Sequence, residues 1–194
     1  MIVWISGLSC SGKSTIVKNI VESQNKNFGD IVIKEGTLVE PTKYFNCIQF
    51  EDFTVIGGRY YSDQTNPGSD RIFAGADRFK DFIIQEYNNH KNFLIEGSRF
   101  FRKEVLDWLV SEYELKIFHI ETDKSIIEER SKDRNGWWDK QRTDRRTDNE
   151  LKKFDKILND NILKQYITVY ENNTMEDSKS ITKNILKILL DKTC

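Results

Sequence analysis

The sequence predicts an α/β protein in which a parallel sheet lies between two layers of helices. Three observations predict this class. Short apolar runs alternate with segments of helical periodicity, no repeat or Pro/Ser-rich linker divides the chain, and the first apolar run opens directly into a glycine-rich loop. Since 194 residues fit one domain of this kind, we expect residues 1–194 to form a single domain.

The glycine-rich loop follows the apolar run from Ile2 to Ile5 and precedes a helical segment from Ser14 to Val21. Its sequence, Gly7 to Ser14, matches the pattern G-x-x-x-x-G-K-[ST] in full. In such a loop the backbone N–H groups surround a triphosphate, the lysine reaches the β and γ phosphates, and the final hydroxyl ligates Mg²⁺. The order of strand, loop and helix predicts a nucleotide site, with Lys13 also catalytic, made by Gly7, Ser9, Cys10, Ser11, Gly12, Lys13, Ser14 and Thr15.

The segment after the first helix does not continue the regular alternation of strands and helices. Residues 30–33 are a strand candidate, and residues 47–50 and 53–56 predict a small β-hairpin that turns at Glu51 and Asp52. From Gly57 to Arg71, glycine, aromatic and charged residues follow one another without periodicity. That composition predicts a surface loop built for contact with another molecule.

The remaining chain returns to alternating helices and strands. Apolar residues at helical spacing predict helices at residues 76–87, 101–113, 123–133, 149–164 and 181–190. Short apolar runs between these helices predict strands at residues 92–97, 115–120 and 166–170. Strands that alternate with helices in this way form parallel sheets covered by helices on both faces.

The composition excludes several classes of protein. The chain is 38% hydrophobic and 31% charged, and no apolar run approaches the ~20 residues that cross a bilayer. No basic, cleavable leader is recognisable, so we expect a cytoplasmic location. Three cysteines are too few and too scattered for a disulfide framework or a zinc site. A net charge of −1 argues against a surface coated for nucleic acid.

Glu96 follows three apolar strand residues and precedes a glycine, so we expect it at the carboxyl edge of the sheet, beside the glycine-rich loop. A carboxylate in that place can hold Mg²⁺ or its waters. An acid at the end of a strand is also common without any such role. Together with the hydroxyl of Ser14, Glu96 is the predicted metal site.

Basic residues are concentrated between Arg130 and Arg146, on both sides of Gly136-Trp137-Trp138. This pattern predicts an arginine-rich helical lid at about residues 130–148, although a solvated basic helix would have the same composition. Arg130 and Arg134, one helical turn apart, are the predicted catalytic and nucleotide-binding pair. Guanidinium groups from a lid would stabilise the charge that develops during phosphoryl transfer and would exclude water.

The segment from Arg59 to Arg78 supplies groups for a second substrate. An acceptor hydroxyl needs a carboxylate that orients it or takes its proton, and Asp70 is the first choice because the turn at Gly68 permits close approach. Asp63 is the alternative, and a helix cap is the other interpretation of Asp70. Arg71 is predicted to act beside these acids. Contacts to the acceptor are predicted from Arg59, Tyr60, Arg78, Arg99, Trp137 and Arg142.

In these features the chain resembles the P-loop kinase superfamily, in its nucleoside and nucleotide kinase branch. Gly7 to Thr15 match the Walker A motif, Phe93 to Gly97 the second motif, and Arg130 to Arg146 the lid. A narrower resemblance, to phage-type kinases, rests on Gly58-Arg59-Tyr60, Gly68-Ser69-Asp70 and Glu96-Gly97. It implies a three-layer P-loop kinase fold that uses ATP and Mg²⁺ to phosphorylate 5-hydroxymethyluracil in phage DNA, the opening step of thymine hypermodification in the host cytoplasm. The acceptor base would be extruded from the helix.

Two other functions stay open. A nucleoside or nucleoside monophosphate kinase is the first, because Glu40-Pro41 resembles the Glu-Pro of deoxynucleoside kinases, in which the glutamate is the base; Glu35 is a further candidate. A regulatory NTPase or binding module is the second. It lacks support because the guanine-specifying Asn-Lys-x-Asp pattern is absent.

Overall fold

The computed structural model describes residues 1–23, 36–42, 45–57, 72, 74–87, 92–135 and 140–191, with the side chains of all of these except 42, 133–135 and 140–146. The strand expected at residues 30–33 and all but the first residue of the expected contact loop at 57–71 lie outside this part of the chain. No helix within it is long and apolar enough to span a bilayer.

The described strands form one sheet in the order β2-β3-β4-β5-β1-β6-β7. The five strands that run parallel are β4 (Thr54–Ile56), β5 (Phe93–Glu96), β1 (Ile2–Gly7), β6 (Leu115–Glu121) and β7 (Ile167–Glu171). The predicted parallel sheet is therefore confirmed. β1 has a parallel neighbour on each edge and an apolar cluster on each face, and all six of its residues are buried.

Two antiparallel strands extend one edge of the sheet, β3 (Phe45–Gln49) next to β4 and β2 (Thr37–Thr42) outermost. The predicted hairpin is confirmed, since Gln49 pairs with Thr54 across the turn at Glu51 and Asp52. We did not predict β2. Its sequence contains a proline and no alternating apolar pattern, and such strands are tolerated where one edge faces solvent.

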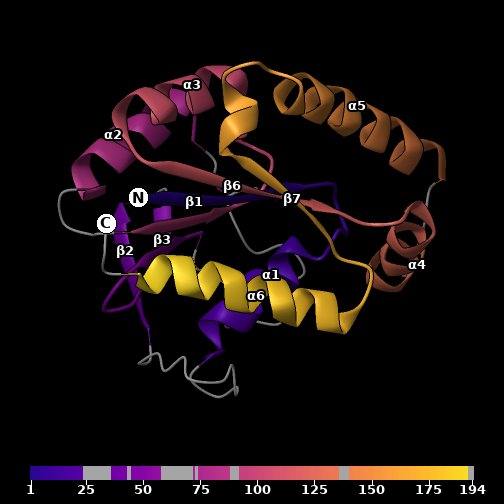
Figure 1. Ribbon diagram of the computed structural model, residues 1–194, viewed down its shortest axis with the longest axis horizontal. Helices are drawn as coiled ribbons and strands as arrows, with labels where there is room; N and C mark the ends of the chain where they lie inside the picture. The colour runs from indigo at the N-terminus through magenta and orange to yellow at the C-terminus, as the bar shows by residue number, and fades with distance from the viewer. Residues whose placement is uncertain are drawn as a thin grey trace.

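Helices cover both faces of the sheet, which confirms the three-layer prediction. Figure 1 shows α1 (Lys13–Val21) and α6 (Met175–Leu190) together on one face, and α2 (Ala76–Tyr87), α3 (Lys103–Glu112) and α5 (Lys140–Leu158) on the other. The helix α4 (Lys124–Asn135) lies at the end of the sheet to which β1 runs. A 3-10 helix, η3 (Leu163–Tyr166), joins α5 to β7.

Two helices have boundaries that differ from the sequence prediction by several residues. The last helix begins at Met175 rather than Ile181, because Thr174 and Asp177 form a capping box: the Thr174 side chain accepts from the Asp177 N–H, and the Asp177 carboxylate accepts from the Thr174 N–H. The helix expected at 149–164 instead spans Lys140–Leu158. It stops there because Asp160 Oδ1 accepts from the Ile162 and Leu163 N–H groups and starts η3. Apolar periodicity is lacking both in residues 140–148, which were expected as part of the helical lid, and in residues 175–180.

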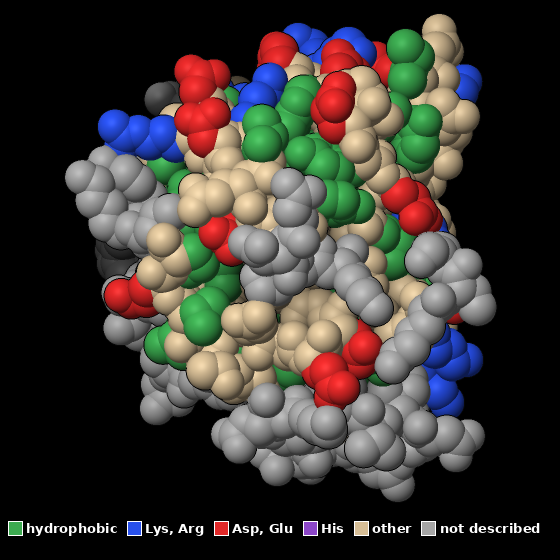
Figure 2. Space-filling model, turned by 90° about the vertical axis from the view of Figure 1, so that its left-hand side faces the viewer, with side chains coloured by type: hydrophobic (Ala, Val, Ile, Leu, Met, Phe, Trp, Pro, Cys, Tyr) green, Lys and Arg blue, Asp and Glu red, His purple; other side chains and the backbone are tan. Residues whose placement is uncertain are grey.

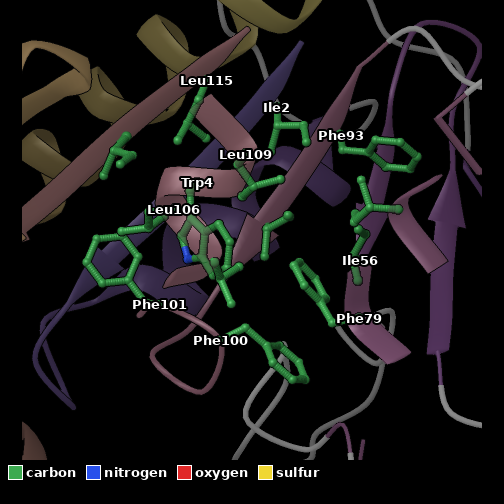
Figure 3. Packing of buried hydrophobic residues seen from close by; sticks show 14 of the residues in the cluster. Ile2, Trp4, Ile56, Phe79, Phe93, Phe100, Phe101, Leu106, Leu109 and Leu115 are labelled. Carbon is green, nitrogen blue, oxygen red and sulfur yellow. The ribbon is translucent and has the colours of Figure 1, made fainter. Parts of the chain in front are cut away.

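The core consists of two apolar clusters, one on each face of the sheet. Side chains of β1 alternate between them, with Ile2 and Trp4 on the side of α2 and α3 and with Val3 and Ile5 on the side of α1 and α6. Figure 3 shows the first cluster, in which Trp4 lies among aromatic rings. The phosphate-loop strand is thereby fixed on both faces.

His119, on β6, is buried. Its Nδ1 lies 3.1 Å from the Ser6 hydroxyl, and its ring meets Phe154 edge-on at 5.0 Å between centroids. Burial, and after it the positive charge of Lys13, lower the pKa of His119 from 6.5 to about 4, while Asp155 acts in the opposite direction. The imidazole is therefore neutral in the folded protein at pH 7.

We expect the free energy of unfolding to fall as the pH falls from about 6.5 to 4. Over this window the unfolded chain binds a proton at His119 and the folded chain does not, so acid favours unfolding. At about 1.4 kcal/mol for each step of one in pKa, the loss approaches roughly 3 kcal/mol below pH 4. Urea unfolding of the wild type and of His119→Gln over this pH range isolates the effect from other groups. Identical pH dependence of the two proteins would contradict the prediction.

Candidate active site

The loop between β1 and α1 has a backbone that glycine alone allows at two points. Gly7 and Gly12 have φ angles of 142° and 88°, and Cys10, at 65°, is the one described non-glycine residue with positive φ. A Cβ at Gly7 would fall against the carbonyl oxygen of Ile120, and a Cβ at Gly12 against the side-chain amide of Asn172. The loop is therefore held tightly between β6 and the residues that follow β7.

The loop carries two buried polar groups suited to a triphosphate. Lys13 is 7% exposed and its Nζ donates to the carbonyl oxygen of Leu8 at 2.6 Å, so its side chain folds back over the loop. The hydroxyl of Ser11 is fully buried and has no hydrogen-bond partner among the described residues. Buried polar groups normally have partners, so an unpaired hydroxyl and a buried cation in one loop fit an anionic ligand. The predicted residues of this loop are thus brought together.

Glu96 lies where the sequence predicts it, at the end of β5 and beside β1. It is 3% exposed, its position pairs with Ile5, and its Oε1 accepts from the Ser14 hydroxyl at 3.3 Å. Carboxylate and hydroxyl oxygens suit Mg²⁺, which takes few protein ligands when phosphates and waters complete its shell. The described residues contain no group of three or more His, Cys, Asp or Glu that could hold a metal by themselves. The pair therefore fits a magnesium ion bound together with a nucleotide.

On the α4 side, the loop is held by residues that the sequence analysis missed. Asn172 is fully buried, its Nδ2 donates to the Ser11 carbonyl at 2.7 Å, and its Oδ1 accepts from Ser178 at 2.6 Å. The Thr122 hydroxyl lies 3.2 Å from the same Ser11 carbonyl. Both Thr122 and Asn172 directly follow parallel strands, and this position at the carboxyl edge of the sheet was the signal that could have identified them.

Among Arg130, Arg134, Trp137 and Arg142, the residues named for the predicted lid, the side chain of Arg130 is described. It lies beside the phosphate loop. Its Nη1 donates to the Asn172 carbonyl at 3.3 Å and its Nη2 to the Asn173 carbonyl at 3.4 Å. Nη1 is also 3.5 Å from where a Cβ of Gly12 would be. The Arg130 guanidinium therefore lies beside Gly12, the residue that precedes Lys13. The arginine-rich lid itself is not shown, because the side chains of Arg134 and Arg142 are not described and Trp137 lies outside the described residues.

A cleft of about 800 Å³ lies near the loop, because Glu150 lines the cleft and its Oε2 accepts from the Ser9 N–H at 3.1 Å. It lies between α2, the turn after β5 and the middle of α5. Its lining contains three cations and one carboxylate among small and apolar residues: Ala74, Gly75, Ala76, Ser98, Arg99, Phe100, Arg102, Asn149, Glu150 and Lys153. A volume of this size is typical of small-molecule sites. At the opposite end of the sheet, on the face where β1 begins, basic and acidic side chains are interspersed among the described residues (Figure 2).

The predicted acceptor residues are only partly placed by the structure. Arg99 lines the cleft, with its guanidinium carbon 6.0 Å from the ring centre of Phe100. Arg78 is exposed on α2 and is not part of the cleft lining. Phe100 and Phe101, which follow Arg99 directly, are buried at 2% and 0% exposure. The other predicted residues lie outside the described part of the chain: Arg59, Tyr60, Asp63, Asp70 and Arg71.

Glu40, the alternative catalytic base, is not near the loop. It lies on β2, four strands from β1 in the sheet order. At ~4.8 Å between neighbouring strands, this separates the two strands by about 19 Å. Glu35 lies outside the described residues.

No protein-family model matches the chain, and no curated protein matches it. Among solved structures, an uncharacterized protein from Eubacterium ventriosum ATCC 27560 is similar, with 16% identity and a TM-score of 0.51 over 97% of both chains. A gluconokinase from Sinorhizobium meliloti 1021 has 12% identity and a TM-score of 0.48, covering 99% of this chain and 97% of that chain. A shikimate kinase from Bacteroides thetaiotaomicron has 11% identity and a TM-score of 0.48 over 98% of both chains. At such identities the likeness concerns the fold, and it extends over nearly the whole chain.

Proposed function

We propose that this protein is an ATP- and Mg²⁺-dependent phosphotransferase. The observation that carries the proposal is the meeting of Lys13, Ser14 and Glu96: a buried lysine in a phosphate loop, followed by a hydroxyl that donates to a buried carboxylate on the neighbouring strand. A glycine turn that binds no ligand does not require a buried lysine beside a hydroxyl and a buried carboxylate. Phosphoryl transfer needs these groups, because catalysis there consists mainly of positioning and of charge stabilisation.

Each part of the site has a role in this reaction. The loop would bind the triphosphate, and Lys13 would neutralise charge on its β and γ phosphates. When bound, Mg²⁺ would offset the negative charge that develops on the phosphates. Ser14 and Glu96 would hold it. Arg130 would approach from the α4 side, and Arg134 would join it from the proposed lid at about residues 130–148.

For the acceptor, we propose a hydroxyl on a nucleobase, with 5-hydroxymethyluracil in DNA as the first candidate. This choice rests on the resemblance of the loop segment 58–70 and Glu96-Gly97 to phage-type kinases. Asp70 or Asp63 would activate the hydroxyl, with Arg71 beside it. The remaining contacts would come from Arg59, Tyr60, Arg78, Arg99, Trp137 and Arg142. A location in the host cytoplasm accompanies this proposal.

A nucleoside monophosphate is the second candidate acceptor, and the cleft favours it. Arg99, Arg102 and Lys153 contribute three cations to a cavity of about 800 Å³, a size that accommodates a nucleotide. Arginine groups suit a phosphate because they can donate two hydrogen bonds to its oxygens. In this case Arg99→Ala should raise the KM for the acceptor more than it lowers kcat.

The acceptor can be identified by offering labelled ATP and Mg²⁺ with deoxynucleosides, their monophosphates, unmodified DNA and hydroxymethyluracil DNA. Label on DNA bases supports the first candidate, and label on free monophosphates alone supports the second. Slow ATP hydrolysis that none of these acceptors stimulates would contradict a kinase and would favour a regulatory NTPase.

A further inference from the structure

Glu150, on α5, contacts the phosphate loop directly. Its Oε2 accepts a hydrogen bond from the backbone N–H of Ser9, in the phosphate loop, at 3.1 Å. Glu150 lies on α5, 141 residues away in the chain, and it also lines the cleft. One turn further along α5, Lys153 Nζ donates to the Ser98 carbonyl at 2.5 Å, two residues after Glu96. These two bonds fix α5 against the loop and against the turn that follows β5.

The partner of Glu150 is a backbone donor of an anion-binding loop. Phosphate oxygens bind to such loops through backbone N–H groups. A bound triphosphate and the Glu150 carboxylate therefore compete for the region around Ser9, and their like charges repel one another. When the carboxylate leaves the Ser9 N–H, α5 keeps it at the border between the loop and the cleft. A second substrate in the cleft would meet it there.

Glu150 is the one acid among the described residues that line the cleft. Glu96, by contrast, is 3% exposed and accepts from the Ser14 hydroxyl. Asp155, also on α5, is exposed and does not line the cleft. The cations Arg99, Arg102 and Lys153 in the same lining can hold an anionic part of an acceptor while its hydroxyl reaches Glu150.

We propose that, for an acceptor bound in the cleft, Glu150 takes the role considered above for Asp70 or Asp63: its carboxylate orients and deprotonates the acceptor hydroxyl, and bound ATP displaces it from the Ser9 N–H. This proposal rests on the phosphotransferase function given above. In the transfer step, the acceptor oxygen forms a bond to the γ-phosphorus, and its proton passes to a Glu150 oxygen. The bond from the γ-phosphorus to the bridging oxygen breaks, and ADP leaves with that electron pair.

The test compares the wild type with Glu150→Ala, Glu150→Gln and Asp155→Ala. The last variant removes one acid from the same helix without touching the cleft. ATP affinity is measured by titration calorimetry with Mg²⁺ and no acceptor, and transfer is measured with the acceptor that the panel above identifies. We expect Glu150→Ala to bind ATP roughly tenfold more tightly, because the competing charged acceptor of the Ser9 N–H is gone. We expect both Glu150 variants to lose about 10²- to 10⁴-fold in kcat, the usual contribution of a general base.

Tighter ATP binding together with lost transfer, and a wild-type response of Asp155→Ala, support the proposal. Transfer at a third or more of the wild-type rate in Glu150→Gln overturns the catalytic role. Unchanged ATP affinity in Glu150→Ala overturns the displacement, even if transfer is lost. A wild type that binds ATP without transferring phosphate to any acceptor refutes the proposed function itself, and the role of Glu150 falls with it. Thermal unfolding of each variant confirms that the compared proteins are folded.

Discussion

Lys13→Ala is expected to reduce phosphoryl transfer by at least about 10³-fold while leaving the protein folded. The ammonium is buried at 7% exposure in the loop that would hold the triphosphate, so its charge acts with little screening by water. Loss of a single preorganised group that stabilises transition-state charge usually costs 10²- to 10³-fold in kcat, and Lys13 would in addition bind the ground-state phosphates. The measurement is kcat/KM for ATP with the acceptor at saturation, beside ATP titration.

Lys18→Ala is the matched control, because Lys18 is on the same helix, exposed, and paired only weakly with Glu22 at 3.7 Å. It should retain transfer. A second readout checks that Lys13 has the charge and place described here: the pKa of His119, which Lys13 helps to lower, should rise in Lys13→Ala and can be followed by NMR. Wild-type transfer in a folded Lys13→Ala protein would refute the role of Lys13 in the reaction.

Trp4→Ala is expected to destabilise the protein by about 3–5 kcal/mol, the usual cost of truncating a large buried aromatic residue. Trp4 is fully buried in the central strand, with ring centroids 5.6 Å from Phe101 and 5.8 Å from Phe79. Its indole N–H also donates to the Gly97 carbonyl at 3.1 Å, directly after Glu96. Since whole domains are stable by only about 5–15 kcal/mol, the variant should be close to unfolding at 37 °C.

Urea unfolding at 25 °C measures the change, with Trp108→Ala as the matched control. Trp108 is partly exposed on α3, where it meets Tyr113 edge-on at 5.5 Å and Lys80 lies over its ring. Its removal should cost clearly less than that of Trp4, because less apolar surface is lost from the interior. Equal destabilisation by the two substitutions would mean that the cluster around Trp4 is not the main source of stability. Trp4→Phe should fall between them, because it keeps a ring but loses the bond to Gly97.

Much of the fold could be predicted because its signals are local. Buried parallel strands appear in the sequence as short apolar runs, and helices as apolar residues three and four positions apart. The alternation of strands and helices could therefore be followed along the chain. The start of α6 was missed because a capping box, not periodicity, begins it at Thr174. The edge strand β2 was missed because an exposed strand has no need of an apolar pattern.

The candidate site likewise contains residues that the sequence could assign and residues that it could not. Gly7 to Ser14 are contiguous, and Glu96 ends a strand, so both could be assigned to one edge of the sheet from the sequence. Glu40 was assigned by a local Glu-Pro pattern, and the strand order places it far from the loop. Asn172 and Thr122 support the loop through side chains that carry no motif of their own.

The sequence by itself determined that a phosphate loop follows the first strand and that Glu96 shares its edge of the sheet, because both depend on the order of residues within single elements. Only the tertiary structure decided which carboxylate meets the loop from the side of the cleft. Glu150 reaches Ser9 because α5 packs over the same face of the sheet as α2 and α3, and that placement comes from burial of residues such as Phe154 and Ile157 in a shared core. Packing between distant elements depends on the shape of the whole interior, and no local pattern encodes it.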